Sequence, residues 1–213
     1  FIELADDNTF VDKRWSRDLV RAIGAAEVHW FTETDVSLAE DPELLDLLAQ
    51  SGCRQVLIGF ESPSAASLQG IEAHDWKARR HDRYRRAIDE IQRRGITVNG
   101  CFIAGLDNDT PDIFEHIERF VKDSGLMEVQ VTVLTPFPGT ALYHRLRAEG
   151  RLLRETYWER CTLFDVNFVP KKMTVEELEQ GLEYLMGSLY TTEEVRRRRG
   201  LYLQTMRNRR VAA

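Results

Sequence analysis

The stretch Val56-Leu57-Ile58-Gly59-Phe60, followed at once by Glu61, decides the fold. A continuous apolar run of this length is typical of a strand that is buried on both faces, as in a parallel sheet. Comparable short runs lie on both sides of it, at residues 1–5, 28–32, 98–104 and 129–134. The sequence therefore predicts a sheet of five strands.

A helical pattern follows each predicted strand. The best marked helix begins at Asp41, a predicted N-cap, has Pro42 at its first helical position and is closed by Gly52. The other predicted helices span residues 13–23, 76–94, 110–125 and 141–148. Alternating strands and helices predict parallel pairing with right-handed crossovers. Two architectures remain open, a barrel and an open doubly wound sheet, and in both of them ligands meet the carboxyl ends of the strands.

The alternation stops after Gly150. Residues 158–169 predict an irregular segment, and Thr174 with Glu177 forms a capping box ahead of an apolar helical stripe. An Arg-rich helix is expected from about Thr192. These patterns predict one domain over residues 1–150 and a mainly helical C-terminal extension over residues 151–213.

Composition narrows the class of protein. The net charge of −6 argues against nucleic-acid binding, which needs a basic surface. No apolar stretch approaches the roughly 20 residues that a transmembrane helix requires. The three cysteines, Cys53, Cys101 and Cys161, are too far apart for a disulfide framework or a compact metal motif, and an odd count without a signal peptide predicts a reducing cytoplasm.

Polar side chains gather where the predicted strands end. Asp6, Asp7 and Asn8 follow the first strand, and they fit the cap of the next helix as well as a ligand contact. Glu61 follows a strongly apolar strand, where a carboxylate needs a partner or a solvated cleft. Gly105 fits both a tight turn and a close approach of backbone to a ligand. From the residues alone we predict an α/β protein with a polar ligand site on one rim.

Four segments in this order resemble the radical S-adenosylmethionine superfamily, most closely the branch that carries an upstream cobalamin-binding domain. They are Ile2–Phe10, Val56–Ser62, Phe102–Thr110 and Leu134–Tyr143. The tail is similar to the extension of a subgroup that includes hopanoid methylases. The resemblance implies an α/β fold, namely a partial TIM-like barrel of six β/α units that here lacks its first unit, with a helical C-terminal extension.

The resemblance also implies cofactors. The family holds a [4Fe-4S] cluster with a CxxxCxxC motif after its first strand, and no such motif occurs in residues 1–213. The cluster ligands are therefore expected upstream of this chain, as is any domain that binds cobalamin. The residues that would bind S-adenosylmethionine are Asp6, Asp7, Asn8, Glu61, Ser62, Ile103, Gly105, Leu106, Thr135 and Pro136.

The function that follows is a portion of a radical S-adenosylmethionine enzyme. The full-length protein would generate a 5′-deoxyadenosyl radical to methylate or rearrange an unreactive carbon of a small molecule, lipid-like substrates included, whereas the isolated chain would be inactive. The alternative is a catalytically degenerate barrel that serves as a binding or scaffolding module. In either case the open edge of the strand at Phe1–Ala5 predicts self-association.

Overall fold

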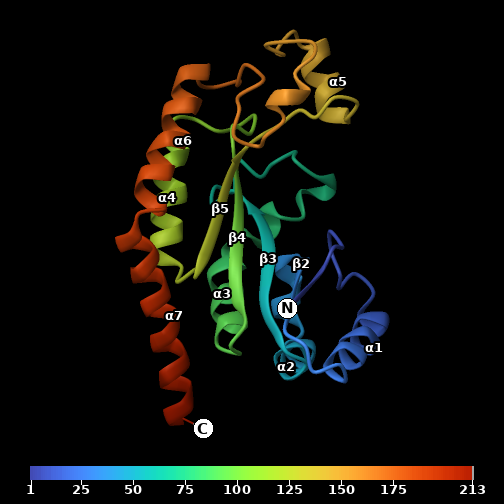
Figure 1. The fold of residues 1–213 in the computed structure, drawn as a ribbon. Coiled ribbons are helices and arrows are strands. Elements are labelled where there is room, and N and C mark those ends of the chain that lie inside the picture. Colours follow the sequence, from blue (N-terminus) through green and yellow to red (C-terminus); the bar gives the residue numbers. More distant parts are fainter. Residues whose placement is uncertain (213) are drawn as a thin grey trace.

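The computed structural model describes residues 1–212, and a sheet of five parallel strands forms its centre (Figure 1). The strands are β1 (Ile2–Leu4), β2 (Trp30–Thr34), β3 (Cys53–Glu61), β4 (Thr97–Ala104) and β5 (Glu128–Val133). Their spatial order is the same as their order in the chain, β1-β2-β3-β4-β5. A doubly wound sheet reverses its strand order, whereas a barrel wall does not, so the order decides for the partial barrel.

Seven α-helices connect and flank these strands in the described part of the chain. They are α1 (Lys13–Gly24), α2 (Pro42–Gln50), α3 (Tyr84–Gln92), α4 (Ile113–Asp123), α5 (Ala141–Ala148), α6 (Val175–Leu189) and α7 (Thr192–Ala212). Short 3₁₀ turns lie at η1 (Val36–Glu40), η2 (Ala73–Asp75), η3 (Ala78–Arg83) and η4 (Trp158–Arg160). The predicted cap at Asp41 and the capping box of Thr174 and Glu177 are both present.

The helix expected over residues 76–94 is wrong in its first half. Only α3 is α-helical there, and η2 and η3 precede it. Three side chains of this stretch make contacts away from it: Lys77 reaches Glu61, Arg80 reaches Glu40, and the His81 ring reaches the carbonyl of Pro63. Because these contacts compete with a straight helix, tertiary structure overrides local propensity here.

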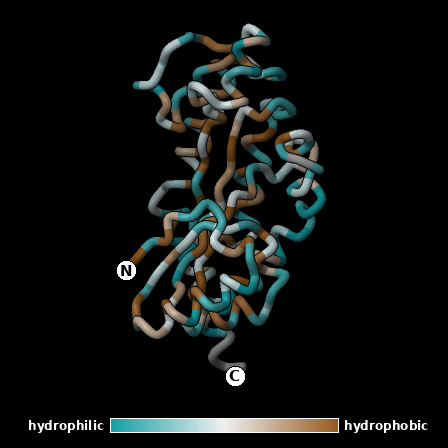
Figure 2. Tube along the Cα trace, turned by 90° about the vertical axis from the view of Figure 1, so that its right-hand side faces the viewer, coloured by the Kyte–Doolittle hydropathy of each residue, from teal (hydrophilic) through white to brown (hydrophobic). Residues whose placement is uncertain are grey.

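The two faces of the sheet differ in polarity. On one face, Phe60 of β3 and Phe102 of β4 are fully buried, and their ring centroids lie 5.9 Å apart. Tyr84 of α3 and Phe120 of α4 pack against them, at 4.7 Å from Phe60 and 5.7 Å from Phe102. The residues that alternate with these along each strand are only half-buried and face the opposite side. In Figure 2 the hydrophobic stretches concentrate in the middle of the molecule.

The C-terminal extension covers the edge of β5. The hydroxyl of Tyr190 accepts a hydrogen bond from the N–H of Val131 and donates one to the carbonyl of Val129, both at 3.1 Å. The carbonyl of Leu163 accepts from the N–H of Val133 at 2.7 Å. Strand edges expose unpaired backbone groups that promote aggregation, so these contacts complete the sheet on this side. The α6 helix lies beside β5 and α4 (Figure 1).

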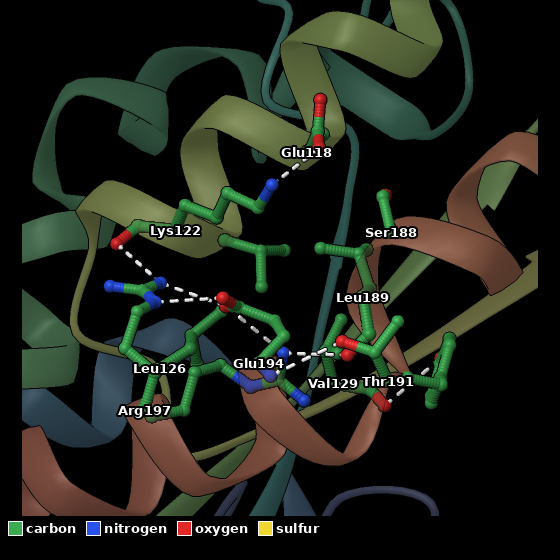
Figure 3. Close-up of polar contacts among 12 residues, drawn as sticks. Glu118, Lys122, Leu126, Val129, Ser188, Leu189, Thr191, Glu194 and Arg197 are labelled. Atoms are coloured by element: carbon green, nitrogen blue, oxygen red, sulfur yellow. Dashed lines mark hydrogen bonds and ion pairs between the residues drawn. The ribbon is translucent and has the colours of Figure 1, made fainter.

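A cluster of charged residues fastens α7 to the barrel (Figure 3). Arg197 donates to the carbonyl of Lys122 in α4 at 3.1 Å and binds the carboxylate of Glu194 through two nitrogens, at 2.7 and 2.8 Å. The buried Arg198 donates to the same carboxylate at 3.3 Å and to the carbonyl of Leu189 at 2.7 Å. Glu194 therefore neutralises two arginines at the start of α7.

We expect Glu194→Gln to lower the free energy of unfolding by about 2 kcal/mol, because charge-assisted bonds to a buried arginine are lost. Hydrogen bonding from Arg197 lowers the pKa of Glu194 below its ordinary value of 4.5. The stabilisation is therefore complete above pH 4.5 and is lost as the pH falls through the lowered pKa.

Urea unfolding of wild type and variant at several pH values measures both effects. The neighbouring exposed Glu193 supplies the control variant, Glu193→Gln, which should unfold like wild type. A difference between wild type and Glu194→Gln that persists unchanged at pH 3 would contradict this account.

Candidate functional site

A cavity of about 510 Å³ opens on the polar face of the sheet, toward the carboxyl ends of the strands. Every strand except β1 contributes to it, and the β1–α1 loop supplies two further residues. Its lining residues are Asp7, Asn8, Glu33, Thr34, Asp35, Leu57, Gly59, Glu61, Glu72, Trp76, Lys77, Cys101, Ile103, Gln130, Thr132 and Leu163.

The lining is strongly acidic. It holds five carboxylates, those of Asp7, Glu33, Asp35, Glu61 and Glu72, against one lysine, which gives a formal charge of −4. Burial raises the pKa of Glu33, and the neighbouring charges of Asp7 and Glu3 raise it further. Such a cavity favours ligands that carry positive charge, because cations gain from the field of several nearby carboxylates.

Glu61 has an unusual backbone. Its φ angle is +61°, in the left-handed region that few residues other than glycine adopt. The register of β3 against β4 shifts at this point: Gly59 pairs with Cys101, and Glu61 pairs with the next residue, Phe102. This β-bulge re-aims the Glu61 side chain, as bulges beside functional sites commonly do. Backbone strain held in place by surrounding structure is a feature of ligand sites.

The Glu61 carboxylate forms an ion pair with the ammonium of Lys77, and both side chains are 18% exposed. The pair lies over Gly59, whose missing side chain makes room for it. A Cβ at Gly59 would lie 2.5 Å from the Glu61 Oε1 and 3.3 Å from the Lys77 Nζ. Gly59, in a strand whose other side chains are larger, therefore leaves the space that this ion pair needs on the polar face.

Asn8 links the first two strand ends. Its amide donates to Asp35 at 2.6 Å, and its oxygen accepts from the Thr34 hydroxyl at 3.3 Å. Asp7 lines the cavity beside it, whereas Asp6 is exposed and lies outside the lining. The loop thus presents one carboxylate, that of Asp7, and one fixed amide to the cavity.

The residues after β4 form a turn around a buried carboxylate. Asp109 is 1% exposed and accepts hydrogen bonds from the N–H groups of Gly105 and Leu106 at 3.0 and 2.9 Å. Gly105 has a φ of +93°, and Leu178 and Phe168 of the extension pack where its side chain would be. Of the predicted residues on this strand, Ile103 lines the acidic cavity, and Leu106 lines a neighbouring cavity of about 460 Å³.

Beside Leu106, Asp107 anchors the extension. It accepts hydrogen bonds from Arg151 at 3.0 Å and Lys171 at 2.9 Å, and also from Arg145. Partial burial would raise the pKa of Asp107, but these hydrogen bonds outweigh it and lower the pKa to about 2. Asp107 therefore connects the turn after β4 to the extension.

Three further predicted site residues make contacts within the protein. The buried Ser62 accepts from the N–H of Ser64 at 3.2 Å. Thr135 donates to the carbonyl of Val133 at 3.0 Å, and the carbonyl of Pro136 accepts from the Tyr157 hydroxyl. The structure thus brings Asp7, Asn8, Glu61 and Ile103 to one cavity, and it places Asp6, Ser62, Gly105, Leu106, Thr135 and Pro136 outside its lining.

Known proteins of similar sequence include methyltransferases and cyclases. Bacteriochlorophyllide d C-12(1)-methyltransferase of Chlorobaculum tepidum is 24% identical over 91% of this chain and 41% of its own length. Hopanoid C-2 methylase of Rhodopseudomonas palustris is 26% identical over 72% of this chain and 30% of its own length. This chain thus spans less than half the length of these relatives. Residues 140–213 match a family described as a domain of unknown function, DUF4070.

Among solved structures, the radical S-adenosylmethionine methyltransferase TsrM from Kitasatospora setae, with tryptophan and a SAM analog bound, superposes with a TM-score of 0.59. It is 16% identical, over 90% of this chain and 37% of its own. Sequence motifs, relatives and fold agree. The chain thus resembles radical S-adenosylmethionine enzymes in its motifs and in its fold. The expected partial barrel is thereby confirmed.

The three cysteines of this chain lie in different parts of the fold. Cys53 is buried at the start of β3, Cys101 lies within β4 and Cys161 follows η4. Burial raises the pKa of both Cys53 and Cys101 to about 12, which disfavours the thiolate that an iron–sulfur cluster needs. Among the described residues, no group of histidine, cysteine and carboxylate side chains could hold a metal ion.

Twelve of the sixteen lining residues were not among the predicted site residues, and Lys77 and Trp76 are two of them. Lys77 begins a basic run that resembles a solvated helix face, and nothing in the sequence pairs it with Glu61, 16 positions earlier. Trp76 reads as the start of a helix but lines the cavity. The signal for Lys77 was indirect: a carboxylate after a buried strand predicts a cation, without saying which one.

Two substitutions at Glu61 separate its backbone strain from its charge. Both Glu61→Ala and Glu61→Gly remove the carboxylate, but only glycine adopts a φ of +61° freely. We expect the glycine variant to be more stable than the alanine variant by about 1 kcal/mol, as measured by urea unfolding. Equal stability, or a more stable alanine variant, would show that the left-handed backbone stores no strain.

Proposed function

We propose that the protein to which this chain belongs is a radical S-adenosylmethionine enzyme and that the acidic cavity binds S-adenosylmethionine. The observation that carries the proposal is the gathering of Asp7, Glu33 and Glu61 around one cavity of about 510 Å³ at the strand ends. S-adenosylmethionine carries a sulfonium and an ammonium against one carboxylate, so its net charge is positive and it gains from a cavity lined with carboxylates.

The residues of this chain fit that ligand. We assign Asp7 and Glu61 to its cationic groups and Asn8 to its amino-acid end. Ile103 provides an apolar surface for the adenine, whereas Gly105, Leu106, Thr135 and Pro136 lie outside the cavity lining and are assigned no contact with the ligand. Asp109 positions the turn, since it holds the N–H groups of Gly105 and Leu106.

The remaining cofactors need ligands from other parts of the full-length protein. Its three cysteines do not fit a [4Fe-4S] cluster, so we place the cluster ligands and any cobalamin-binding domain in other parts of the full-length protein. When bound, the cluster would supply the electron that cleaves S-adenosylmethionine. TsrM, which superposes on this chain, has been solved with cobalamin and a [4Fe-4S] cluster.

The reaction proposed for the full-length protein is methylation or rearrangement of an unreactive carbon in a small molecule. The names of the relatives support methylation: their substrates include a bacteriochlorophyllide and a hopanoid. A lipid-like or otherwise largely apolar substrate is the finer proposal. No helix among the described residues is long and apolar enough to span a membrane, and a cytoplasmic location is likewise a proposal.

Two structural proposals accompany this function. We divide the chain into a barrel segment, residues 1–150, and an extension, residues 151–213, that covers the β5 edge through Tyr190. The other edge belongs to β1, which pairs only with β2 in the described residues. Self-association of the isolated chain through β1 is therefore expected, because an open edge offers unpaired backbone groups.

Equilibrium dialysis of the full-length protein with radiolabelled S-adenosylmethionine tests the binding proposal. We expect Glu61→Gln and Asp7→Asn each to weaken binding about tenfold, the loss of one favourable charge interaction. Glu43→Gln, at an α2 carboxylate whose side chain is 90% exposed, is the matched control and should bind like wild type.

Full-length protein that binds no S-adenosylmethionine at any accessible concentration would overturn the proposal in favour of the scaffolding module. Binding that is unaffected by both cavity variants would place the ligand elsewhere on the protein.

A further inference from the structure

Lys77 is the one cation among the described residues that line the acidic cavity, and its ammonium already occupies the Glu61 carboxylate. A ligand cation that approaches Glu61 therefore competes with the Lys77 ammonium for the carboxylate. The pair packs closely over Gly59, because even a methyl group there would crowd both partners.

The segment that carries Lys77 is held by local hydrogen bonds, and its side chains Ile71, Trp76 and Ala78 pack against the hydrophobic core. The N–H of Lys77 donates to the Glu72 carboxylate at 2.5 Å, and the N–H of Gly70 donates to Asp75 at 2.7 Å. His74 and Asp75 have φ angles of +63° and +50°, so two consecutive residues hold strained left-handed backbone. The long side chain of Lys77 can turn away from Glu61 by rotation about its own bonds, while the segment stays packed against the core.

The side chain next to Lys77 closes the same cavity. Trp76 lines it, and the guanidinium of Arg80 lies 4.2 Å from the centre of the Trp76 ring. Movement of Lys77 away from Glu61 therefore takes place at the cavity wall, beside an aromatic ring that can report on it.

We propose that Lys77 is an internal counter-ion for Glu61 that the cationic group of the ligand displaces, so that Lys77 swings to solvent when the cavity fills. The proposal rests on the proposed binding of S-adenosylmethionine. The Lys77 ammonium repels a second cation that approaches Glu61, so the bound ligand favours the state in which Lys77 has moved away, and it shifts the equilibrium only through that preference.

This arrangement makes Lys77 a specificity-determining residue. A ligand with a positive charge replaces the lost ion pair, because it gives Glu61 a new partner. A neutral adenosine derivative offers no such replacement, so Lys77 stays in place and that ligand gains nothing from the carboxylate. The empty site meanwhile avoids an unpaired, largely buried carboxylate, which would be costly.

Amine acetylation of the full-length protein, followed by mass spectrometry, measures the position of Lys77 directly. We expect the acetylation rate of Lys77 to rise several-fold with S-adenosylmethionine and to stay unchanged with the neutral 5′-methylthioadenosine. Lys13, Lys122, Lys171 and Lys172 are internal references in the same digest. A Lys77 that becomes less reactive with S-adenosylmethionine would overturn the proposal, because the ligand would then cover it instead of displacing it.

Affinity supplies the second measurement. Removal of the competing ammonium in Lys77→Met should tighten S-adenosylmethionine binding about tenfold, since the ligand no longer has to break the pair. Lys77→Arg keeps the charge and should bind within a few-fold of wild type. Weaker binding by Lys77→Met, with normal binding by wild type, would overturn the role of Lys77 but leave the binding site intact.

No binding by wild type or by Lys77→Met would overturn both proposals together. Binding that appears only in Lys77→Met would support both, because the ammonium would then be the barrier that hides the site.

Discussion

The position of the Glu61 carboxylate at the end of β3 depends on several local constraints. The bulge between Gly59 and Glu61 turns the side chain toward the open face of the sheet, at the cost of a left-handed backbone. Gly59 leaves the space that the carboxylate and Lys77 fill. Phe60, which lies between Gly59 and Glu61 in the sequence, is fully buried on the other face of the sheet. Its carbonyl accepts a hydrogen bond from the hydroxyl of Tyr84. The packed face thus holds the strained residue in position for the polar face.

The two faces divide the work of the molecule. The aromatic and aliphatic side chains on the helix side supply the burial that stabilises the domain, whereas the opposite side carries half-buried acids, amides and hydroxyls that a closed core would not tolerate. A strand that alternates in this way has no freedom to slip by one residue, because the slip would exchange the two faces. The strand register therefore fixes both the position of the site and the stability of the sheet.

The C-terminal extension completes this design at one edge. Tyr190 pairs with two backbone groups of β5, and Asp107 connects the turn after β4 to Arg151 and Lys171 of the extension. The turn that follows β4 is consequently held from two sides, by the buried Asp109 and by the extension. Glu194 and its two arginines hold α7 against the barrel and so keep the extension in place.

Much of this could be predicted from the sequence, because each strand is a short apolar run and most helices carry their own caps. The strand order could not, since periodicity is the same in a barrel and in a doubly wound sheet. The start of α3 was misjudged because Lys77 and His81 make contacts outside the local segment. Glu61 was found from one physical rule, that a carboxylate after a buried strand needs a partner. Its partner was not found, because an ion pair leaves no periodic signal.

The central claim is that a cationic group of the ligand contacts the Glu61 carboxylate. A crystal structure of the full-length protein with S-adenosylmethionine is its most direct test. It should place the ligand in the cavity between Asp7 and Ile103, with a cationic group at the Glu61 carboxylate and the Lys77 side chain turned away from it. A ligand bound elsewhere, with the Glu61–Lys77 pair still closed, would contradict the account.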